Sequence, residues 1–164
     1  MSNFQWAHEE EIDILVEVNW SSPVTHDMLH GGLVGEDDTA YFYAIIGRFD
    51  REWWPFYIGK VYSQSVSQRH KNKDHLKRLE KLKKLYPSTT WHITLGTPKF
   101  EFKNVSEKTI NEIEGLLIYG NWHEESINRS KINTFHSYNH IQITNTGFND
   151  PFHKKISYGV LVEE

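Results

Sequence analysis

The sequence predicts an α+β fold with a small mixed or antiparallel sheet flanked by helices, and three observations support this prediction. Short segments with apolar residues at every second position occur near both ends and in the middle of the chain. Two longer segments place apolar residues at helical spacing, and turn-forming residues separate these segments. The 164 residues suffice for one domain with a core and are too few for two ordinary domains, so we expect a single domain over residues 1–164.

The first strands are expected on either side of a long loop. Residues 11–18 alternate apolar side chains with others, which is typical of a half-buried strand, and residues 21–38 are rich in glycine and acidic residues. Residues 40–47 and 55–61 then predict the two strands of a β-hairpin. The polar residues 48–54 are expected to form its turn.

The hairpin is followed by a helix, a strand and a second helix. Residues 65–85 predict an amphipathic helix that ends before Pro87. Its apolar side consists of Leu76, Leu79, Leu82 and Leu85. Residues 91–96 predict a strand that pairs with the hairpin. Ser106 is expected to cap a second helix that ends near Gly120. Its apolar side consists of Ile110, Ile113, Leu116 and Leu117, with Tyr119 as a further candidate.

Two more strands are expected near the C-terminus, at residues 140–144 and 156–162. The pattern leaves open whether residues 12–18 and 156–162 extend the central sheet or pair with each other. The resulting order is one strand, then a ββαβα unit, then two further strands.

The charge distribution predicts one basic face on an acidic protein. Residues 69–84 hold eight Lys or Arg and two acids, whereas the remaining 148 residues hold ten basic and twenty acidic side chains. Such a face attracts a phosphate backbone, so we expect nucleic acid as the partner. The candidate phosphate contacts are Lys71, Lys73, Lys77, Arg78 and Lys81.

Composition excludes several classes of chemistry. The chain has no cysteine, so it has no disulfide, no thiolate nucleophile and no Cys-ligated zinc. No segment has the ~20 apolar residues that cross a bilayer, and residues 1–11 lack the basic and apolar parts of a signal peptide. We therefore expect a soluble, cytoplasmic protein that does not bind membranes. His136 and His140 have helical spacing, but the β-like sequence after them argues against a zinc site there.

Two tyrosine-containing segments carry a resemblance to a known family. Tyr57, Ile58 and Gly59 are followed by Lys60, and residues 41–43 end in Tyr43 with an isoleucine two residues further on. Residues 40–130 resemble the GIY-YIG nuclease superfamily, whose core is a small ββαβα unit. The match covers a little over half of the chain and leaves residues 1–39 and 131–164 as β extensions.

The resemblance extends to further positions in the same order. The arginine that the family places near the start of its first core helix corresponds to Arg69, with His70 and His75 as candidates for the histidine that follows. The acidic residue before a Leu-Ile pair corresponds to Glu114, or to Glu112 if the register shifts. Asn128 lies near the position of the family's asparagine.

This resemblance implies a metal-dependent endonuclease that hydrolyses phosphodiester bonds, in DNA rather than RNA. It implies Mg²⁺ or Mn²⁺ bound through Glu114 and waters, and Arg69 as the clamp on the phosphate. Tyr43 would orient or deprotonate the attacking water, with Lys60 favouring phenolate and His70 or His75 passing on the proton. Tyr57 would hold the phosphate or Tyr43 by a hydrogen bond.

Other readings of the same residues remain open. Trp53 and Trp54, expected at the tip of the hairpin turn, are candidates for contacts with nucleic acid, as is Asn128. The first family glycine is replaced by Tyr41, which favours an alternative in which the same fold binds nucleic acid or a protein partner without cutting. A homodimer, or an unrelated α+β interaction domain, are further possibilities.

Overall fold

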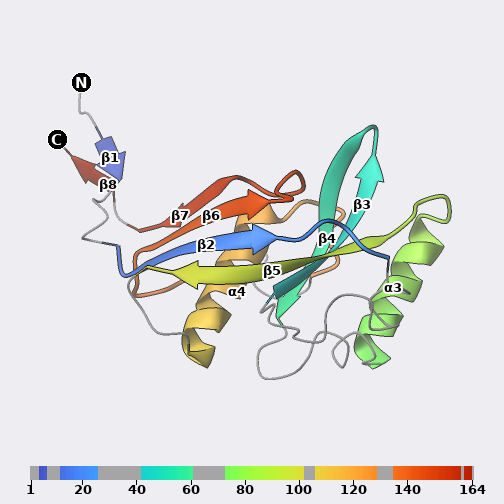
Figure 1. The fold of residues 1–164 in the computed structure, drawn as a ribbon, viewed down its shortest axis with the longest axis horizontal. Coiled ribbons are helices and arrows are strands. Elements are labelled where there is room, and N and C mark those ends of the chain that lie inside the picture. The colour runs from blue at the N-terminus through green and yellow to red at the C-terminus, as the bar shows by residue number, and fades with distance from the viewer. Residues whose placement is uncertain are drawn as a thin grey trace.

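The computed structural model describes residues 4–6, 12–25, 42–60, 73–101, 106–128, 135–159 and 161–163. Figure 1 shows the strands and helices of these residues. The elements in chain order are β1 (Phe4–Trp6), β2 (Ile14–Trp20), β3 (Phe42–Phe49), β4 (Glu52–Lys60), α3 (Lys73–Leu85), β5 (His92–Phe100), α4 (Glu107–Asn121), β6 (Ile141–Gly147), β7 (Lys155–Tyr158) and β8 (Leu161–Glu163). The predicted α+β class is confirmed, and β3, β4, α3, β5 and α4 follow one another in ββαβα order.

The main sheet has six strands in the order β4-β3-β5-β2-β6-β7, so the prediction of a small sheet was wrong. The sheet is mixed, because β2 runs parallel to β6 while the other neighbours are antiparallel. The physical reason for its size is that strands from both ends of the chain extend it. β2 pairs with β5 on one side and with β6 on the other, which joins the terminal strands to the hairpin.

The structure resolves the placement of the terminal strands. The segment predicted at 12–18 lies within the main sheet as β2. The segment predicted at 156–162 is divided: β7 is an edge strand of the main sheet, whereas β8 pairs with β1 in a separate two-stranded sheet. Figure 1 shows this second sheet beside the two termini.

The hairpin between β3 and β4 has a much shorter turn than the sequence predicted. Phe49 pairs with Glu52, so the turn consists of Asp50 and Arg51, both with positive φ (49° and 71°). Two adjacent residues with positive φ are the requirement of a type I′ turn, which matches the twist of the flanking strands. Trp53 and Trp54 therefore lie in β4 and not in a turn, which corrects the prediction.

A β-bulge changes the side-chain alternation in β4. Ile45 pairs with Tyr57 and Ile46 with Pro55, which leaves Phe56 as the extra residue. At a bulge two successive residues lie opposite a single partner, and the alternation of side chains is locally interrupted. Phe56 and Tyr57 accordingly both pack against the same apolar cluster.

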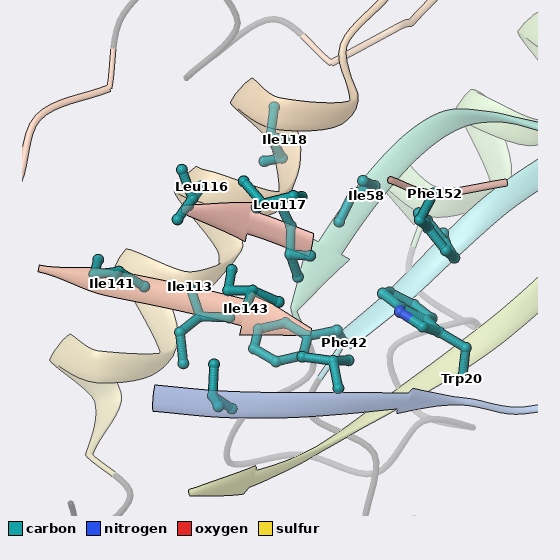
Figure 2. Close-up of a cluster of buried hydrophobic side chains, with 14 of the residues drawn as sticks. Trp20, Phe42, Ile58, Ile113, Leu116, Leu117, Ile118, Ile141, Ile143 and Phe152 are labelled. Carbon is teal, nitrogen blue, oxygen red and sulfur yellow. The ribbon is translucent and has the colours of Figure 1, made fainter. Parts of the chain in front are cut away.

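The sheet has an apolar cluster on each face. On one face, Phe42, Ala44 and Ile58 pack with residues of α4, and Figure 2 shows this cluster with side chains of β6 and Trp20. On the other face, Tyr43 and Ile45 pack with residues of α3. Neighbouring residues of β3 thus point to opposite helices, as the period of a strand requires.

Helix α4 agrees closely with its prediction. Ser106 caps it, since its side chain accepts a hydrogen bond from the backbone N–H of Thr109, and the helix ends one residue after Gly120. The four predicted apolar residues from Ile110 to Leu117 are buried. Tyr119 is 46% exposed and does not belong to the apolar side.

Helix α3 is amphipathic as predicted and ends two residues before Pro87, but only part of its leucine series is buried. Leu79 and Leu82 are buried, whereas Leu76 is 41% and Leu85 56% exposed. Residues three apart differ by about 60° around a helix with 3.6 residues per turn, so four such leucines spread over about half the circumference. Only the middle two therefore face the sheet. The predicted start of this helix, residues 65–72, lies outside the described residues.

Candidate functional site

Tyr43 and Gly59 form the closest link between the two tyrosine-containing segments. They are paired residues of β3 and β4, and Tyr43 is completely buried. A Cβ at position 59 would lie 2.7 Å from Cε1 of Tyr43 and 2.9 Å from its hydroxyl oxygen. Real Cβ atoms do not approach other atoms so closely, so the Tyr43 ring requires a glycine opposite it. The tyrosine of the first segment thus explains the glycine of the second.

Tyr57 lies beside Tyr43 on the face of the sheet that α3 covers. The bulge at Phe56 leaves Tyr57 against the α3-side cluster, where its side chain is half-buried. The centroids of the Tyr43 and Tyr57 rings are 5.8 Å apart with an interplanar angle of 38°. This separation is typical of interacting aromatic pairs, so the two rings hold one another in place.

Arg78 of α3 completes a three-residue cluster with the tyrosines. Its guanidinium carbon lies 4.3 Å from the centroid of the Tyr57 ring, a cation–π contact. Its Nη1 donates a hydrogen bond to the hydroxyl of Tyr43 at 3.5 Å. Tyr43, Tyr57 and Arg78 therefore meet from three consecutive elements, β3, β4 and α3.

The sequence placed Arg78 among the phosphate contacts and not among the catalytic residues. The sequence nevertheless contains a signal for its position, because Arg78 precedes Leu82 by four residues and such residues lie on the same side of a helix. Leu82 is buried, so Arg78 lies on the side of α3 that faces the sheet. Arg69 and His70, which the sequence proposed as catalytic residues, and Lys71, proposed as a phosphate contact, lie outside the described residues. Lys73 and His75 belong to the first turn of α3.

The side chain of Lys60, in β4, points to the face of the sheet that α4 covers. It pairs with Phe42, which packs in the α4-side cluster, and its Nζ donates a hydrogen bond to Oδ1 of Asn111 on α4. Glu114 lies one turn further along α4 and is half-buried. The described contacts thus bring Tyr43, Tyr57 and Arg78 together, while Lys60 and Glu114 belong to the opposite face of β4.

Glu112 is engaged in a structural contact. Its carboxylate accepts a hydrogen bond from the Ser137 hydroxyl at 2.8 Å and from Nδ2 of Asn139 at 3.1 and 3.0 Å. These bonds hold residues 137–139 against α4. Of the two acidic candidates, Glu112 therefore has a described role in holding this segment against α4.

The candidate metal donors among the described residues are single carboxylates. Within the ranges that the structure describes, no group of three or more His, Asp or Glu side chains gathers as a metal cluster. Mg²⁺ needs only one or two carboxylates because it retains several of its waters. A single carboxylate such as that of Glu114 meets this requirement, whereas tetrahedral zinc requires three or four protein ligands.

Asn128 binds the backbone of the edge strand β4. Its Oδ1 accepts from the Ile58 N–H and its Nδ2 donates to the Ile58 carbonyl, both at 2.9 Å. The preceding residue, Ile127, donates its N–H to the Phe56 carbonyl at 2.7 Å. Asn128, which is 9% exposed, thus continues the hydrogen-bonding pattern of the sheet and fixes the segment on either side of Tyr57.

The two adjacent tryptophans have different environments. Trp53 is half-buried against the α4-side cluster, with its ring 5.5 Å from that of Phe148. Trp54 is 41% exposed and its ring centroid lies 5.5 Å from that of His123. Trp54 therefore retains the exposed surface that the sequence predicted for the pair, although it belongs to a strand.

Comparisons with protein-family models, with curated proteins and with solved structures found no match. The described residues define an α+β protein whose six-stranded mixed sheet carries a helix on each face. No helix among the described residues is both long enough and apolar enough to span a bilayer.

Proposed function

We propose that this protein is a metal-dependent endonuclease of the GIY-YIG type that hydrolyses phosphodiester bonds in nucleic acid, with DNA as the preferred substrate. The observation that carries the proposal is the cluster of Tyr43, Tyr57 and Arg78. Their three elements stand in the β, β, α order of the ββαβα unit that the family resemblance implies. The cluster lies against the basic helix, where a phosphate backbone is attracted.

Arg78 is the residue we assign to the phosphate. A guanidinium has five N–H donors in one plane, so Arg78 can donate to Tyr43 and still bind two phosphate oxygens. Its charge stabilises the negative charge that develops on the phosphorus oxygens in the transition state. Tyr57 holds the guanidinium by its ring face and so positions Arg78.

Tyr43 is the residue we assign to the attacking water. Its hydroxyl oxygen accepts a hydrogen bond from Arg78, so the Tyr43 hydroxyl and the guanidinium that binds the phosphate stand next to each other. In this assignment Tyr43 orients the water that attacks phosphorus. Arg69, His70 and His75 remain candidates for proton transfer and phosphate binding.

Glu114 is the residue we assign to Mg²⁺ or Mn²⁺, with waters as the other ligands. When bound, the metal supplies charge neutralisation at the phosphate and at the leaving oxygen. Lys60 and Asn111 form a hydrogen-bonded pair one turn before Glu114, and this pair fixes α4 against β4. The helix that carries Glu114 is thereby held against the edge strand β4, on the face opposite to Tyr57.

The exposed side of α3 supplies contacts to the phosphate backbone. Lys77 and Lys81 are exposed and lie one turn apart, on either side of the half-buried Arg78 along the helix. The Glu80 carboxylate lies 3.9 Å from the Lys84 ammonium and offsets part of its positive charge. Both side chains are exposed, so the attraction between them is weak. A nucleic-acid strand that follows Lys77 and Lys81 passes the tyrosine cluster.

A second candidate function has one observation in its favour. The Tyr43 side chain is 0% exposed, which is the expectation for a tyrosine that holds two strands together. In this alternative the same basic helix binds nucleic acid, or a protein partner, without cutting. The two candidates differ in one measurable property, which is cleavage in the presence of Mg²⁺ or Mn²⁺.

The test is a cleavage assay on supercoiled plasmid, branched DNA and single-stranded RNA, with Mg²⁺, Mn²⁺ or EDTA. The wild type is compared with Tyr43→Phe and Glu114→Gln, and with Glu124→Gln as a matched control, because Glu124 is an exposed carboxylate just beyond α4. The endonuclease predicts metal-dependent cutting that both site variants lose and the control retains. Binding of DNA by a folded wild type without any cutting supports the second candidate.

A further inference from the structure

A hollow of about 510 Å³ opens at the tip of the hairpin, away from the tyrosine cluster. It is lined by residues 51–55 of the hairpin, residues 121–123 at the end of α4, and residues 150–153 between β6 and β7. This volume falls within the range of pockets that bind small organic molecules or single nucleotides. Neither the catalytic assignment nor the basic helix uses these residues.

Three tryptophans supply the aromatic walls of the hollow. Trp54 and Trp122 are 41% and 40% exposed, whereas Trp53 is half-buried against the α4-side cluster. Large aromatic side chains with this much exposed surface around a hollow are the usual platform for stacking a planar ligand.

His123 fixes the orientation of Trp54. Its Nε2 bonds the Pro55 carbonyl at 2.5 Å, so this nitrogen carries the proton, and its Nδ1 accepts the N–H of Glu125 at 3.2 Å. The imidazole is thereby held in one tautomer with its edge against Trp54. The Trp54 ring is therefore positioned before any ligand arrives, which lowers the entropic cost of binding.

The polar groups of the hollow distinguish a base from a phosphate. Glu52 and Asp150 are exposed carboxylates at its rim, beside a single guanidinium, Arg51. Carboxylates accept hydrogen bonds from the amino groups of bases and repel phosphate oxygens. A planar ring with N–H donors can stack on the tryptophans and donate to these carboxylates. A phosphate group binds more favourably to the basic side of α3.

The hollow and the tyrosine cluster lie along the same strand. His123 contacts the rings of both Trp54 and Phe56, at 5.5 and 5.1 Å, and Tyr57 follows Phe56. At about 3.3 Å per residue, Trp54 and Tyr57 are about 10 Å apart along β4. A single strand whose phosphate is held at Arg78 can reach the hollow with a nearby base.

We propose that the hollow binds an unpaired nucleobase by stacking on Trp54 and Trp122, with hydrogen bonds from the base to Glu52 or Asp150. The inference rests on the proposed function, because it takes the nucleic acid at Arg78 as the source of the base. It adds a preference for nucleic acid that contains an unpaired stretch, such as a branch, a bulge or a single strand.

The test measures binding of a short single-stranded DNA oligonucleotide and of a matched oligonucleotide with abasic sites. The variants are Trp54→Ala, Trp122→Ala and the stacking-competent Trp54→Phe and Trp122→Phe. Tyr138→Ala is the control, since Tyr138 is 93% exposed and lies outside the hollow. Thermal unfolding checks that each variant is folded, and 2-aminopurine fluorescence reports the stacking of the base.

The proposal predicts that the wild type binds the base-bearing oligonucleotide about ten-fold more tightly than the abasic one, with quenched 2-aminopurine. This preference is lost in the alanine variants and retained in the phenylalanine variants and the control. Equal binding of both oligonucleotides by the wild type, or an unchanged preference in folded alanine variants, would refute base binding in the hollow. Either result would leave the endonuclease proposal unaffected. Absence of any nucleic-acid binding overturns both.

Discussion

The ring of Tyr43 on β3 lies so close to Gly59 on β4 that no side chain fits at position 59. The same tyrosine accepts a hydrogen bond from Arg78, whose guanidinium rests on Tyr57. The buried Tyr43 side chain thus requires a glycine at position 59, and its hydroxyl contacts α3, the helix that carries the basic residues. The two tyrosine segments are therefore one structural unit, and substitutions in one have consequences in the other.

Gly59→Ala is expected to destabilise the protein by roughly 1–3 kcal/mol, the usual cost of inserting a methyl group into a well-packed core. The reason is the 2.7 Å distance between the new Cβ and Cε1 of Tyr43. Chemical denaturation measures the effect. In a Tyr43→Ala background, which lacks the colliding ring, the same substitution should cost clearly less, and equal costs in both backgrounds would show that the ring is not the obstacle.

Asn128→Ala is expected to cost about 2–3 kcal/mol of stability, because it leaves the buried N–H and carbonyl of Ile58 without the amide partners they have at 2.9 Å. Hydrogen exchange at the Ile58 amide should accelerate. Asn128→Asp keeps the acceptor and loses the donor, so it should still protect that amide. Unchanged exchange in Asn128→Ala would refute a structural role for this side chain.

Tyr86 provides a pH-dependent prediction. Its hydroxyl donates to the Glu125 carboxylate, and this bond, together with burial and the negative charge, raises the pKa of Tyr86 above its ordinary value of about 10. Since the pKa is raised in the folded state, the stabilisation is complete below pH about 10 and is lost as the pH rises through the raised value.

Glu125→Gln should therefore move the titration of Tyr86 to lower pH, because it removes the charge that opposes phenolate. Ultraviolet titration of the tyrosines measures the shift. Glu124→Gln is the matched control, since Glu124 is an exposed neighbour in the same turn. A Tyr86 titration that is identical in wild type and Glu125→Gln would contradict the assigned bond.

Much of the fold could be predicted from the sequence where a single periodicity dominates. The alternation in residues 14–20 and the spacing of Ile110, Ile113 and Leu117 each bury one side of one element, so pattern and structure agree. The size of the sheet could not be predicted in this way. The pairing of β2 with both β5 and β6 joins residues more than seventy positions apart, and no local pattern encodes such a contact.

The hairpin and the candidate site show where local reasoning fails. Residues 48–54 were expected to form the turn, yet positive φ at Asp50 and Arg51 closes the turn in two residues and places Trp53 in β4. The bulge at Phe56 then brings Phe56 and Tyr57 to one face, which strict alternation does not predict. The rings of Tyr43 and Tyr57 lie 5.8 Å apart, and Arg78 as their partner emerges only from the packing of α3.

The measurement that tests the central claim most directly compares Arg78→Ala with wild type for cleavage and for binding of the same branched DNA in Mg²⁺. Arg78→Lys tests whether charge alone suffices, and Arg48→Ala is the matched control, because Arg48 is an exposed arginine whose guanidinium lies over Trp53 instead. If Arg78 clamps the reacting phosphate, Arg78→Ala cuts about a hundred-fold more slowly or worse, while its affinity for DNA falls far less. Arg78→Lys restores little, because an ammonium lacks the planar fork. Cleavage by folded Arg78→Ala at the wild-type rate, or no cleavage by the wild type, would contradict the account.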